Sequence, residues 1–459
     1  MLRIFGKKYP LRKFILFTGE GFFLFISLYL IYCSQPHTAA LSNSDIIFRV
    51  FIAVSVCLLS LYYFDLYNFR YGYSYFEMST RLFQALGSAC IFLGFFYFLF
   101  PRFMPGRGVF LKEIVAFIIF SSIWRYIYIW FLKRDIGSKP VLVVGQGNAI
   151  DRLFSEIKEN SDCGYKVKGV VIPENEPSPQ NIDVPVWNGF HKILEKARDL
   201  GVDEIIVALQ EKRGVLPVDE LLQCKMKGLS IIDGETFIEE ISGKLAIDSI
   251  NPSWLIFKEG FQKGPIKMFF KQLIGSMFAF VGLLLSLPVT LLVSLLIKVE
   301  SEGPVFFKQE RVGYEGKTFT LIKFRSMRSD AEKDGAKWAQ KDDDRVTKVG
   351  KVIRKLRIDE IPQMWNVLKG DMNFVGPRPE RPEFVEELKK KIKYYDQRHS
   401  VKPGITGWAQ INYPYGASIE DAKRKLEYDL YYIKHMSVLL DLYIILKTVK
   451  TILFREGSR

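Results

Sequence analysis

Cysteine is scarce in this chain, with five among 459 residues, and acidic residues are outnumbered by basic ones. The cysteines are scattered, and no two have the spacing of a disulfide framework or a zinc site. A stapled secreted domain and a cysteine-based metal centre are therefore disfavoured. Proline and glycine show no period, which argues against a collagen-like fibre, and an apolar content of 49% is too high for a disordered chain. The length suggests about three domains.

Four apolar runs in the first third of the chain predict membrane-spanning helices. They are 14–32, 46–64, 82–100 and 110–132. A bilayer core of ~30 Å needs about 20 helical residues, which each run supplies within a turn. We assign them to a first domain of residues 1–134. Glu20 and Arg125 lie well inside the runs, and either packing between helices or a buried functional role is compatible with that position.

The distribution of Lys and Arg predicts the orientation of these helices. Residues 1–13 contain five basic side chains, whereas the loop 33–45 contains none. Because cytoplasmic loops carry the excess of Lys and Arg, we expect the N-terminus and everything after Lys133 on the cytoplasmic side. The pattern therefore predicts a multi-pass membrane protein whose soluble domains face the cytoplasm.

Residues 138–250 alternate short β-type runs with amphipathic stretches, which predicts a parallel, Rossmann-like α/β sheet. The glycine fingerprint of dinucleotide-binding domains is incomplete. Gly145 and Gly147 are present, but Ile150 occupies the third glycine position, and Glu174 is a weak candidate for the acidic residue after the second strand. We favour a degenerate domain that keeps the fold as a scaffold or regulator over one that binds a dinucleotide.

A fifth apolar run, 268–297, contains Ser286 and Pro288. One straight helix of that length would be ~45 Å long, beyond the ~30 Å core. Proline removes an amide donor and clashes with the preceding turn, so we expect a break at these two residues. Basic residues flank both ends, which favours a re-entrant helix with both ends in the cytoplasm. An ordinary kinked span is the alternative.

From residue 264 onward there are 35 Lys and Arg against 24 Asp and Glu, so most of the formal charge of +14 lies in this last part. A basic domain held at a membrane suits anionic lipids and phosphorylated substrates. Nucleic acid is disfavoured as a partner, because no nucleic-acid-binding motif is present.

The turn at 313–316 predicts a β-hairpin. On its second strand Lys323 and Arg325 are two residues apart, so both project from one face. They are either a phosphate clamp or part of a solvated strand face. The Asp-rich run 342–344 is flanked by Lys and Arg, and we interpret it as a solvated loop rather than a metal site.

Asp359 and Glu360 are adjacent carboxylates at the start of a predicted short helix. Asp359 suits the N-cap, and Gly370 suits the stop. A helix N-terminus favours the charged form of a carboxylate, so Asp359 is expected to be ionised and ready at neutral pH. One carboxylate can then attack phosphorus while the other holds a divalent cation. The alternative is an ordinary capping pair.

A proline-rich loop at 376–382 presents Arg378 and Arg381 at low entropic cost, and Arg is suited to bidentate phosphate contacts. These arginines could equally pair with nearby carboxylates. Residues 402–408 form a second rigid loop that contains Lys402.

The last part of the chain contains four short motifs in sequence order. They are Lys-Phe-Arg-Ser-Met at 323–327, Ile-Asp-Glu-Ile-Pro-Gln at 358–363, Val-Gly-Pro-Arg-Pro at 375–379 and Lys-Pro-Gly-Ile-Thr-Gly at 402–407. Residues 264–459 thereby resemble the bacterial sugar transferase family, the polyprenyl-phosphate phosphoglycosyl transferases with one membrane-penetrating helix. The preceding part resembles the larger members, with four spans and a Rossmann-like domain. Residues 381–384 and 416–422 are similar to the exopolysaccharide branch. Arg357 and Ile358 depart from the family, in which many members have Ser or Thr followed by Leu before the carboxylate pair.

The resemblance implies a multi-domain membrane protein: spans at 1–134, a Rossmann-like domain at 138–250 and an α+β transferase domain at 264–459 with a re-entrant helix. It implies transfer of a sugar-1-phosphate from a UDP-sugar to undecaprenyl phosphate at the bacterial inner membrane, with release of UMP, as a first step toward exopolysaccharide, capsule or O-antigen. Asp359 would form an aspartyl-phosphosugar, and Glu360 would hold Mg²⁺. The substrate-binding cations implied are Lys308, Arg311, Lys323, Arg325, Arg378, Arg381 and Lys402. The sugar and the oligomeric state, a homo-oligomer included, are left open.

Two other classes are weighed against this one. A membrane-bound nucleotide-sugar dehydratase needs a Tyr-x-x-x-Lys pair beside a complete glycine fingerprint, but the two such pairs, Tyr9 with Lys13 and Tyr443 with Lys447, lie outside residues 138–250. A non-catalytic membrane scaffold would not need the intact carboxylate pair at 359–360.

Overall fold

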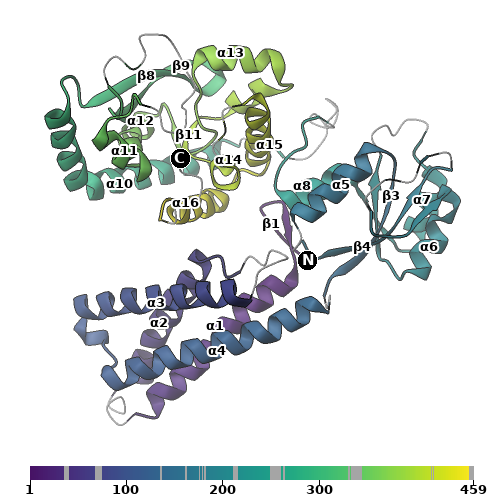
Figure 1. The fold of residues 1–459 in the computed structure, drawn as a ribbon, viewed down its shortest axis with the longest axis horizontal. Coiled ribbons are helices and arrows are strands. Elements are labelled where there is room, and N and C mark those ends of the chain that lie inside the picture. Colours follow the sequence, from purple (N-terminus) through teal and green to yellow (C-terminus); the bar gives the residue numbers. More distant parts are fainter. Residues whose placement is uncertain are drawn as a thin grey trace. The chain divides into compact units, whose positions relative to one another are not determined.

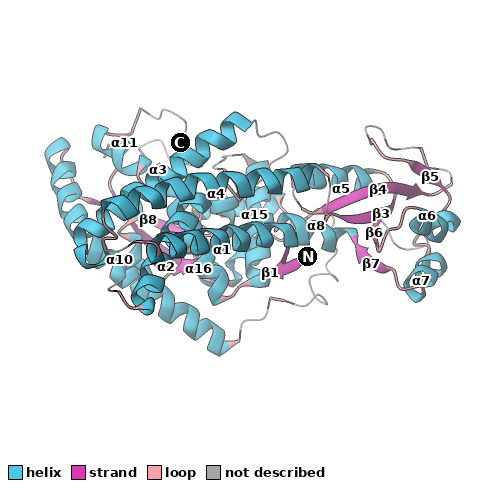
Figure 2. Ribbon diagram, turned by 90° about the horizontal axis from the view of Figure 1, so that it is seen from below, coloured by secondary structure: helices cyan, strands magenta, loops and turns pink. Residues whose placement is uncertain are grey.

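The computed structural model describes most of the chain, and its contacts separate into two compact units, Met1–Ser242 and Gly243–Arg459. The first unit contains four long helices and an α/β sheet domain (Figure 1), and the second combines helices with short strands (Figure 2). The described residues are 1–35, 41–67, 75–134, 137–160, 163–174, 176–177, 179, 182–209, 215–248, 260–261, 264–328, 331, 344–414, 416 and 418–453.

The four predicted spans are all helical. They are α1 (Leu11–Cys33), α2 (Asn43–Tyr63), α3 (Tyr75–Leu99) and α4 (Arg107–Lys133). Leu28 and Phe117 belong to the apolar core between them. Large apolar side chains also point outward, and Phe83 and Phe98 on α3 are 63% and 79% exposed. Apolar residues on both the inner and the outer face are what helices in lipid require. The prediction of four membrane helices is confirmed.

The two charges inside these helices, Glu20 on α1 and Arg125 on α4, form a buried ion pair. Their Oε2 and Nη2 atoms are 2.9 Å apart, and the hydroxyl of Tyr67 donates to the same carboxylate oxygen at 2.8 Å. Arg125 also donates to the carbonyl of Leu66 at 2.6 Å. Since each charge finds its partner within the bundle, the structure supports packing between helices over a separate function.

The second part of this unit is a five-stranded parallel sheet with the order β5-β4-β3-β6-β7. Its strands are β3 (Lys139–Gly145), β4 (Tyr165–Ile172), β5 (Val186–Asn188), β6 (Glu204–Ala208) and β7 (Ser230–Asp233). Its helices are α5 (Asn148–Glu159), α6 (Ile193–Asp199), α7 (Val218–Met226) and α8 (Gly234–Ser242). An apolar cluster lies on each face, one with α5 and α8 and the other with α6 and α7. The Rossmann-like prediction is confirmed.

The turn between β3 and α5 departs from a dinucleotide site in its contacts as well as in its sequence. Ile150 is fully buried in the apolar core. Gln146 donates to Glu176 at 3.0 Å, and a Cβ on Gly147 would lie 3.5 Å from the other oxygen of that carboxylate. A carboxylate therefore lies beside the turn at which a pyrophosphate would bind. Glu174, the candidate ribose ligand, is 71% exposed and 3.5 Å from His191.

The second unit has an α+β fold. Its strands are β8 (Phe306–Val312), β9 (Thr318–Phe324), β10 (Asn373–Val375) and β11 (Gly404–Thr406). Its helices are α10 (Pro265–Glu300), α11 (Lys348–Lys355), α12 (Gln363–Lys369), α13 (Pro382–Lys391), α14 (Trp408–Asn412), α15 (Ile419–His435) and α16 (Val438–Leu453), with the 3₁₀ turns η4 (Tyr314–Gly316), η5 (Ile358–Glu360) and η6 (Tyr395–Ser400). The predicted hairpin is present as the antiparallel pair β8 and β9.

The long apolar helix α10 bends. Ala279 in its first half packs with Leu321, and Val293 in its second half packs with Phe324. Leu321 and Phe324 are three residues apart on β9, about 10 Å, whereas Ala279 and Val293 would lie ~21 Å apart on a straight helix. The two clusters therefore lie too close together for a straight α10, and Figure 1 shows a turn along this helix.

The bent stretch contains the residues at which we predicted a break. Pro288 lies inside α10 and has no amide to donate to the preceding turn. The hydroxyl of Thr290 donates to the carbonyl of Ser286 at 2.9 Å, and the hydroxyl of Ser286 donates to Leu283 at 3.2 Å. Such side-chain bonds back to carbonyls of the preceding turn accompany bends in helices.

Candidate active site

The two adjacent carboxylates lie in a single 3₁₀ turn, η5. Arg357 precedes them with a φ of 57°, so the chain enters the turn from a left-handed residue. We predicted that Asp359 is the N-cap of the following helix, and this prediction is wrong. Helix α12 begins at Gln363, and its N-cap is Pro362. The predicted stop is confirmed, because Gly370 ends α12 with a φ of 90°. A tight turn, rather than a helix N-terminus, presents the pair.

Glu360 is surrounded by three cations. Its Oε1 lies 2.6 Å from Arg378, 3.4 Å from Arg357 and 3.9 Å from Lys323. Burial by itself would raise the pKa of Glu360, but the charges of Arg378, Lys323 and Arg357 outweigh it and hold the pKa well below its usual value. Glu360 is therefore a fixed anion that gathers basic groups around η5.

Asp359 lies in a different environment from its neighbour. It is 8% exposed, and its Oδ1 has no hydrogen-bond partner among the described residues. Burial and then the charge of Glu360 raise the pKa of Asp359 to about 6, although Lys323 and Arg378 oppose the change. The expectation that the site favours the charged form of Asp359 is wrong. The carboxylate is still mostly ionised at pH 7, and its raised pKa makes it more basic.

Lys323 and Arg325 do not form one clamp. Lys323 faces Glu360, and burial followed by the charge of Arg378 lowers the pKa of this lysine to about 8. Arg325 is used elsewhere, because its guanidinium donates to backbone carbonyls at the end of α10. The acceptors are Ile297, Ser301 and Glu302. A cation at this position satisfies the open carbonyls and the negative end of the helix.

The other cations on the hairpin and the proline-rich loop are spread around the site. Arg311 on β8 donates to the carbonyl of Pro379 at 3.2 Å, and its charge contributes to the low pKa of Lys323. Lys308, on the same strand, is exposed. Arg381 precedes α13 and lies 3.6 Å from Glu383. Of Arg311, Lys308 and Arg381, it is Arg311 whose charge acts on Lys323, the lysine beside the carboxylate pair.

The third and fourth motifs are neighbours because β10 and β11 are parallel. Gly376 donates its amide to Thr406, and Gly404 donates its amide to Pro377, both at 2.9 Å. A Cβ on Gly376 would lie 2.5 Å from the carbonyl of Lys402, so only glycine permits this approach. The side chain of Lys402 lies 3.4 Å from Gln272 on α10.

Sequence reasoning missed two residues of the site. Arg357 was noted only as a departure from relatives, yet it is one of the three cations on Glu360. Asn366 on α12 accepts from the amide of Ile322 at 3.1 Å and donates to the carbonyl of Thr320 at 2.8 Å. It thereby joins β9, which carries Lys323, to the helix that follows η5. The signal that could have indicated this is an Asn between the apolar pairs Met364-Trp365 and Val367-Leu368 of α12.

A divalent cation fits the residues present only in part. Asp359 and Glu360 supply carboxylate oxygens, which Mg²⁺ prefers, and the unbonded oxygen of Asp359 is buried. Among the described residues no group of three or more acidic, His or Cys side chains could hold a metal. Phosphate oxygens of a substrate would have to complete the coordination. Asp342 and Asp343 of the Asp-rich run lie outside the described residues.

The model of the bacterial sugar transferase family matches residues 266–455, and that of a CoA-binding domain matches residues 62–217. A UDP-glucose:undecaprenyl-phosphate glucose-1-phosphate transferase of Klebsiella pneumoniae is 32% identical over 352 residues, which cover 74% of this chain and 73% of that protein. The chain belongs to the bacterial sugar transferase family. The predicted family and the prediction of a transferase enzyme are thereby confirmed, and the non-catalytic scaffold is disfavoured.

Two further relatives carry related names. A protein of the same name from Escherichia coli K12 is 32% identical over 331 residues, covering 70% of this chain and 69% of that protein. A UDP-N-acetylgalactosamine-undecaprenyl-phosphate N-acetylgalactosaminephosphotransferase of Aeromonas hydrophila is 44% identical over 239 residues. That match covers 52% of this chain and 56% of the Aeromonas protein, little more than half of each.

The dehydratase alternative finds no support in the residues that it would need. Of its two Tyr-x-x-x-Lys pairs, the second lies on α16 in the transferase unit, where Lys447 donates to Asn412 at 2.7 Å and lies over the ring of Trp408. Neither residue of that pair belongs to the Rossmann-like sheet.

Proposed function

We propose that this transferase moves a sugar-1-phosphate from a UDP-sugar to undecaprenyl phosphate and releases UMP. The observation that carries the proposal is the contrast at 359–360: Glu360 is held by three cations, while the buried oxygen of Asp359 is unbonded within the described chain. The names of the relatives support the substrate class, since they specify UDP-sugars and undecaprenyl phosphate.

The reaction divides into two phosphoryl transfers through Asp359. In the first, a carboxylate oxygen forms a bond to the phosphorus that carries the sugar. The bond from this phosphorus to the bridging oxygen breaks, and UMP leaves with the electron pair. In the second, an oxygen of undecaprenyl phosphate attacks the same phosphorus, and Asp359 leaves as a carboxylate. The lipid product is an undecaprenyl-diphospho-sugar.

The side chains around the pair supply what phosphoryl transfer requires, which is positioning and neutralisation of charge. Lys323, Arg357 and Arg378 are held beside Asp359 through Glu360, so their positive charge is in place before the diphosphate binds. Glu360, with Asp359, would hold Mg²⁺ together with substrate phosphates. When bound, this ion would neutralise phosphoryl oxygens and stabilise the leaving group.

The basic residues near the N-terminus and at both ends of α10 indicate how the chain enters and leaves the membrane. The N-terminal residues 1–13 are rich in Lys and Arg, which favours a cytoplasmic N-terminus at the inner membrane. Lys267 and Lys298 lie near the two ends of the bent helix α10. We therefore place both ends of α10 in the cytoplasm, with the bend inside one leaflet. This path would bring η5 to the depth of the lipid phosphate.

The test is a covalent trap with UDP-sugars labelled in the sugar, in the absence of lipid acceptor. The relatives differ in the sugar that their names specify, so a panel that includes UDP-glucose and UDP-N-acetylgalactosamine is required. Label should attach to the chain at Asp359, be accompanied by one UMP, and be removed by undecaprenyl phosphate. If UMP is released only when both substrates are bound and no label attaches, transfer is direct and the role of Asp359 is wrong.

A further inference from the structure

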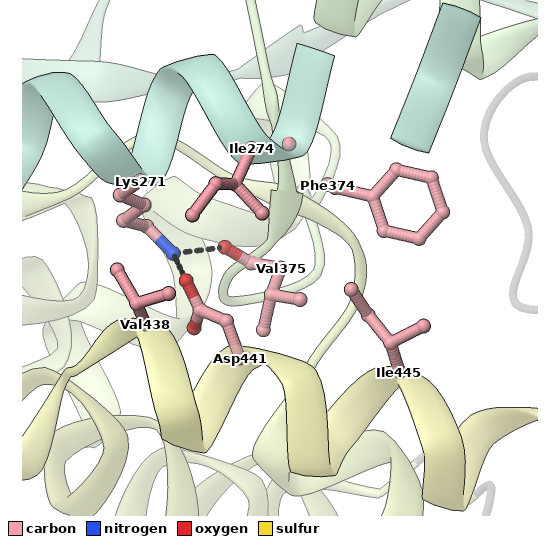
Figure 3. Close-up of a pocket in the computed structure, with 8 residues that line it drawn as sticks. Lys271, Ile274, Phe374, Val375, Val438, Asp441 and Ile445 are labelled. Atoms are coloured by element: carbon pink, nitrogen blue, oxygen red, sulfur yellow. Dashed lines mark hydrogen bonds and ion pairs between the residues drawn. The ribbon is translucent and has the colours of Figure 1, made fainter. Parts of the chain in front are cut away.

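A second buried polar cluster lies apart from the carboxylate pair, where α10, β10 and α16 meet (Figure 3). Lys271 on α10 donates to Asp441 on α16 at 2.6 Å and to the carbonyl of Val375 at 2.9 Å. It also donates to the hydroxyl of Tyr432 on α15. Tyr432 in turn donates to Asp441 at 2.7 Å and lies 3.3 Å from the same carbonyl. The three residues are at most 7% exposed.

A buried lysine in a membrane-penetrating helix is costly unless it is paired, so its position needs a physical reason. The ion pair with Asp441 compensates the charge. Beyond its own side chains the cluster binds one backbone carbonyl, that of Val375, which accepts from Lys271 as Figure 3 shows. Val375 is the last residue of β10, directly before the loop that carries Arg378.

The stretch from Val375 to Arg378 is stiff, so the position of its first carbonyl affects its last side chain. Pro377 has a fixed φ. The amide of Gly376 and the carbonyl of Pro377 are both bonded to β11. At the other end, Arg378 contacts Glu360 at 2.6 Å. A shift at Val375 therefore has few backbone torsions in which it could be absorbed before it reaches the guanidinium.

We propose that Lys271, together with Asp441 and Tyr432, is a positioning residue for Arg378. The cluster fixes the carbonyl of Val375 against α10 and α16 and so sets the place of the guanidinium on Glu360. The membrane helix thereby takes part in building the active site. This inference rests on the proposed function only in its activity readout.

The main test is a double-mutant cycle between Lys271→Met and Arg378→Ala, measured as the single-turnover rate of sugar-phosphate transfer. In the wild-type background Lys271→Met should lower the rate about tenfold or more, with KM for the UDP-sugar nearly unchanged. In the Arg378→Ala background it should lower the rate less than twofold, because the group that it positions is gone. Lys267→Met, one turn earlier on α10, is the matched control. If Lys271→Met lowers the rate equally in both backgrounds, the cluster only stabilises the fold and does not position Arg378.

Two further measurements keep the test decisive. Should Lys271→Met fail to fold, Tyr432→Phe removes two hydrogen bonds of the cluster but keeps the ring and the ion pair, and the same cycle applies. Hydrogen exchange of residues 373–381 is independent of catalysis and should become faster in either variant, relative to residues 318–324. Unchanged exchange overturns the positioning role. A wild-type protein that transfers no sugar phosphate overturns the proposed function instead, while the exchange result still decides this inference.

Discussion

At the scale of single residues, two adjacent carboxylates acquire opposite properties. Glu360 forms ion pairs with Arg357, Arg378 and Lys323, and these positive charges hold its pKa low. Asp359 is left with burial and a neighbouring negative charge, which raise its pKa. Such divergence of two neighbouring acids is the usual sign of divided chemical roles. Here it distinguishes a more basic carboxylate, that of Asp359, from one that is held as an anion among cations, that of Glu360, and the proposed roles rest on this contrast.

We predict that Asp359→Asn abolishes transfer. The amide keeps the shape of the side chain but is a far weaker nucleophile, so UMP release and lipid-linked product should both fall by more than about 10³-fold. Glu360→Gln is the comparison, and it should slow transfer while still allowing the chain to become labelled. Substantial turnover by Asp359→Asn, measured as UMP release by purified protein, would contradict the nucleophile assignment.

The pH dependence of kcat/KM should be bell-shaped. The rate should rise as pH increases through about 6, because the attacking form of Asp359 is the deprotonated one. It should fall as pH increases through about 8, because Lys323 then loses its charge. Lys323→Arg should remove the alkaline limb and keep the acidic one, since Arg stays charged over this range. An acidic limb near pH 4 in the wild type would mean that Asp359 is not desolvated in the working enzyme.

At the scale of elements, the bent helix α10 packs against the transferase domain on one side and exposes apolar side chains on the other. Ala279 in its first half belongs to an apolar cluster with Val367 of α12, and Val293 in its second half belongs to one with Ile353 of α11. Its outward side chains are apolar, with Leu285 75% and Leu291 64% exposed. A helix that folds back on one small domain and exposes apolar residues along its length is suited to lie in one leaflet. By length and composition alone α10 is also long enough to span a membrane, so labelling of its two ends has to distinguish the two paths.

We predict that Lys267→Cys and Lys298→Cys, made in a background without native cysteine, both resist a membrane-impermeant thiol label in intact cells. Both should be labelled once the cells are permeabilised. Arg102→Cys, in the exposed turn between α3 and α4, is the positive control, because the predicted orientation places it outside. Labelling of the position at 298 alone in intact cells would identify α10 as a true span.

At the scale of the whole molecule, the Rossmann-like sheet has the parallel strand order of dinucleotide-binding domains. The turn between β3 and α5, where such domains bind a pyrophosphate, differs from theirs. Ile150 fills the space of the third glycine, and Glu176 lies beside Gly147. A carboxylate at that turn repels the pyrophosphate that such a turn would otherwise bind. The arrangement favours a scaffold or regulatory domain attached to a transferase.

We therefore predict that turnover does not depend on NAD. Protein freed of small molecules by dialysis and gel filtration should release UMP at the same rate with or without added NAD, within twofold. The control is Glu176→Gln, which removes the repelling charge and should leave the rate unchanged. Strict dependence of the wild-type rate on NAD would show that the turn binds a cofactor in spite of its contacts.

The sequence by itself determined the features that depend on short spacing. Apolar runs of membrane length, strands alternating with helices, the hairpin turn and the stop at Gly370 all follow from local patterns. The carboxylate pair was found because its members are covalent neighbours. The ordered motifs likewise needed no coordinates, and the family they indicated is the one to which the chain belongs.

Only the tertiary structure decided which cations meet the pair. Lys323 and Arg325 are two residues apart, yet one faces Glu360 and the other binds carbonyls at the end of α10. Arg357 enters the turn η5 from a left-handed backbone conformation, and its guanidinium lies 3.4 Å from Glu360. The raised pKa of Asp359 was also beyond sequence reasoning. Burial and the directions of long side chains are set by packing between distant segments, and spacing along the chain does not encode them.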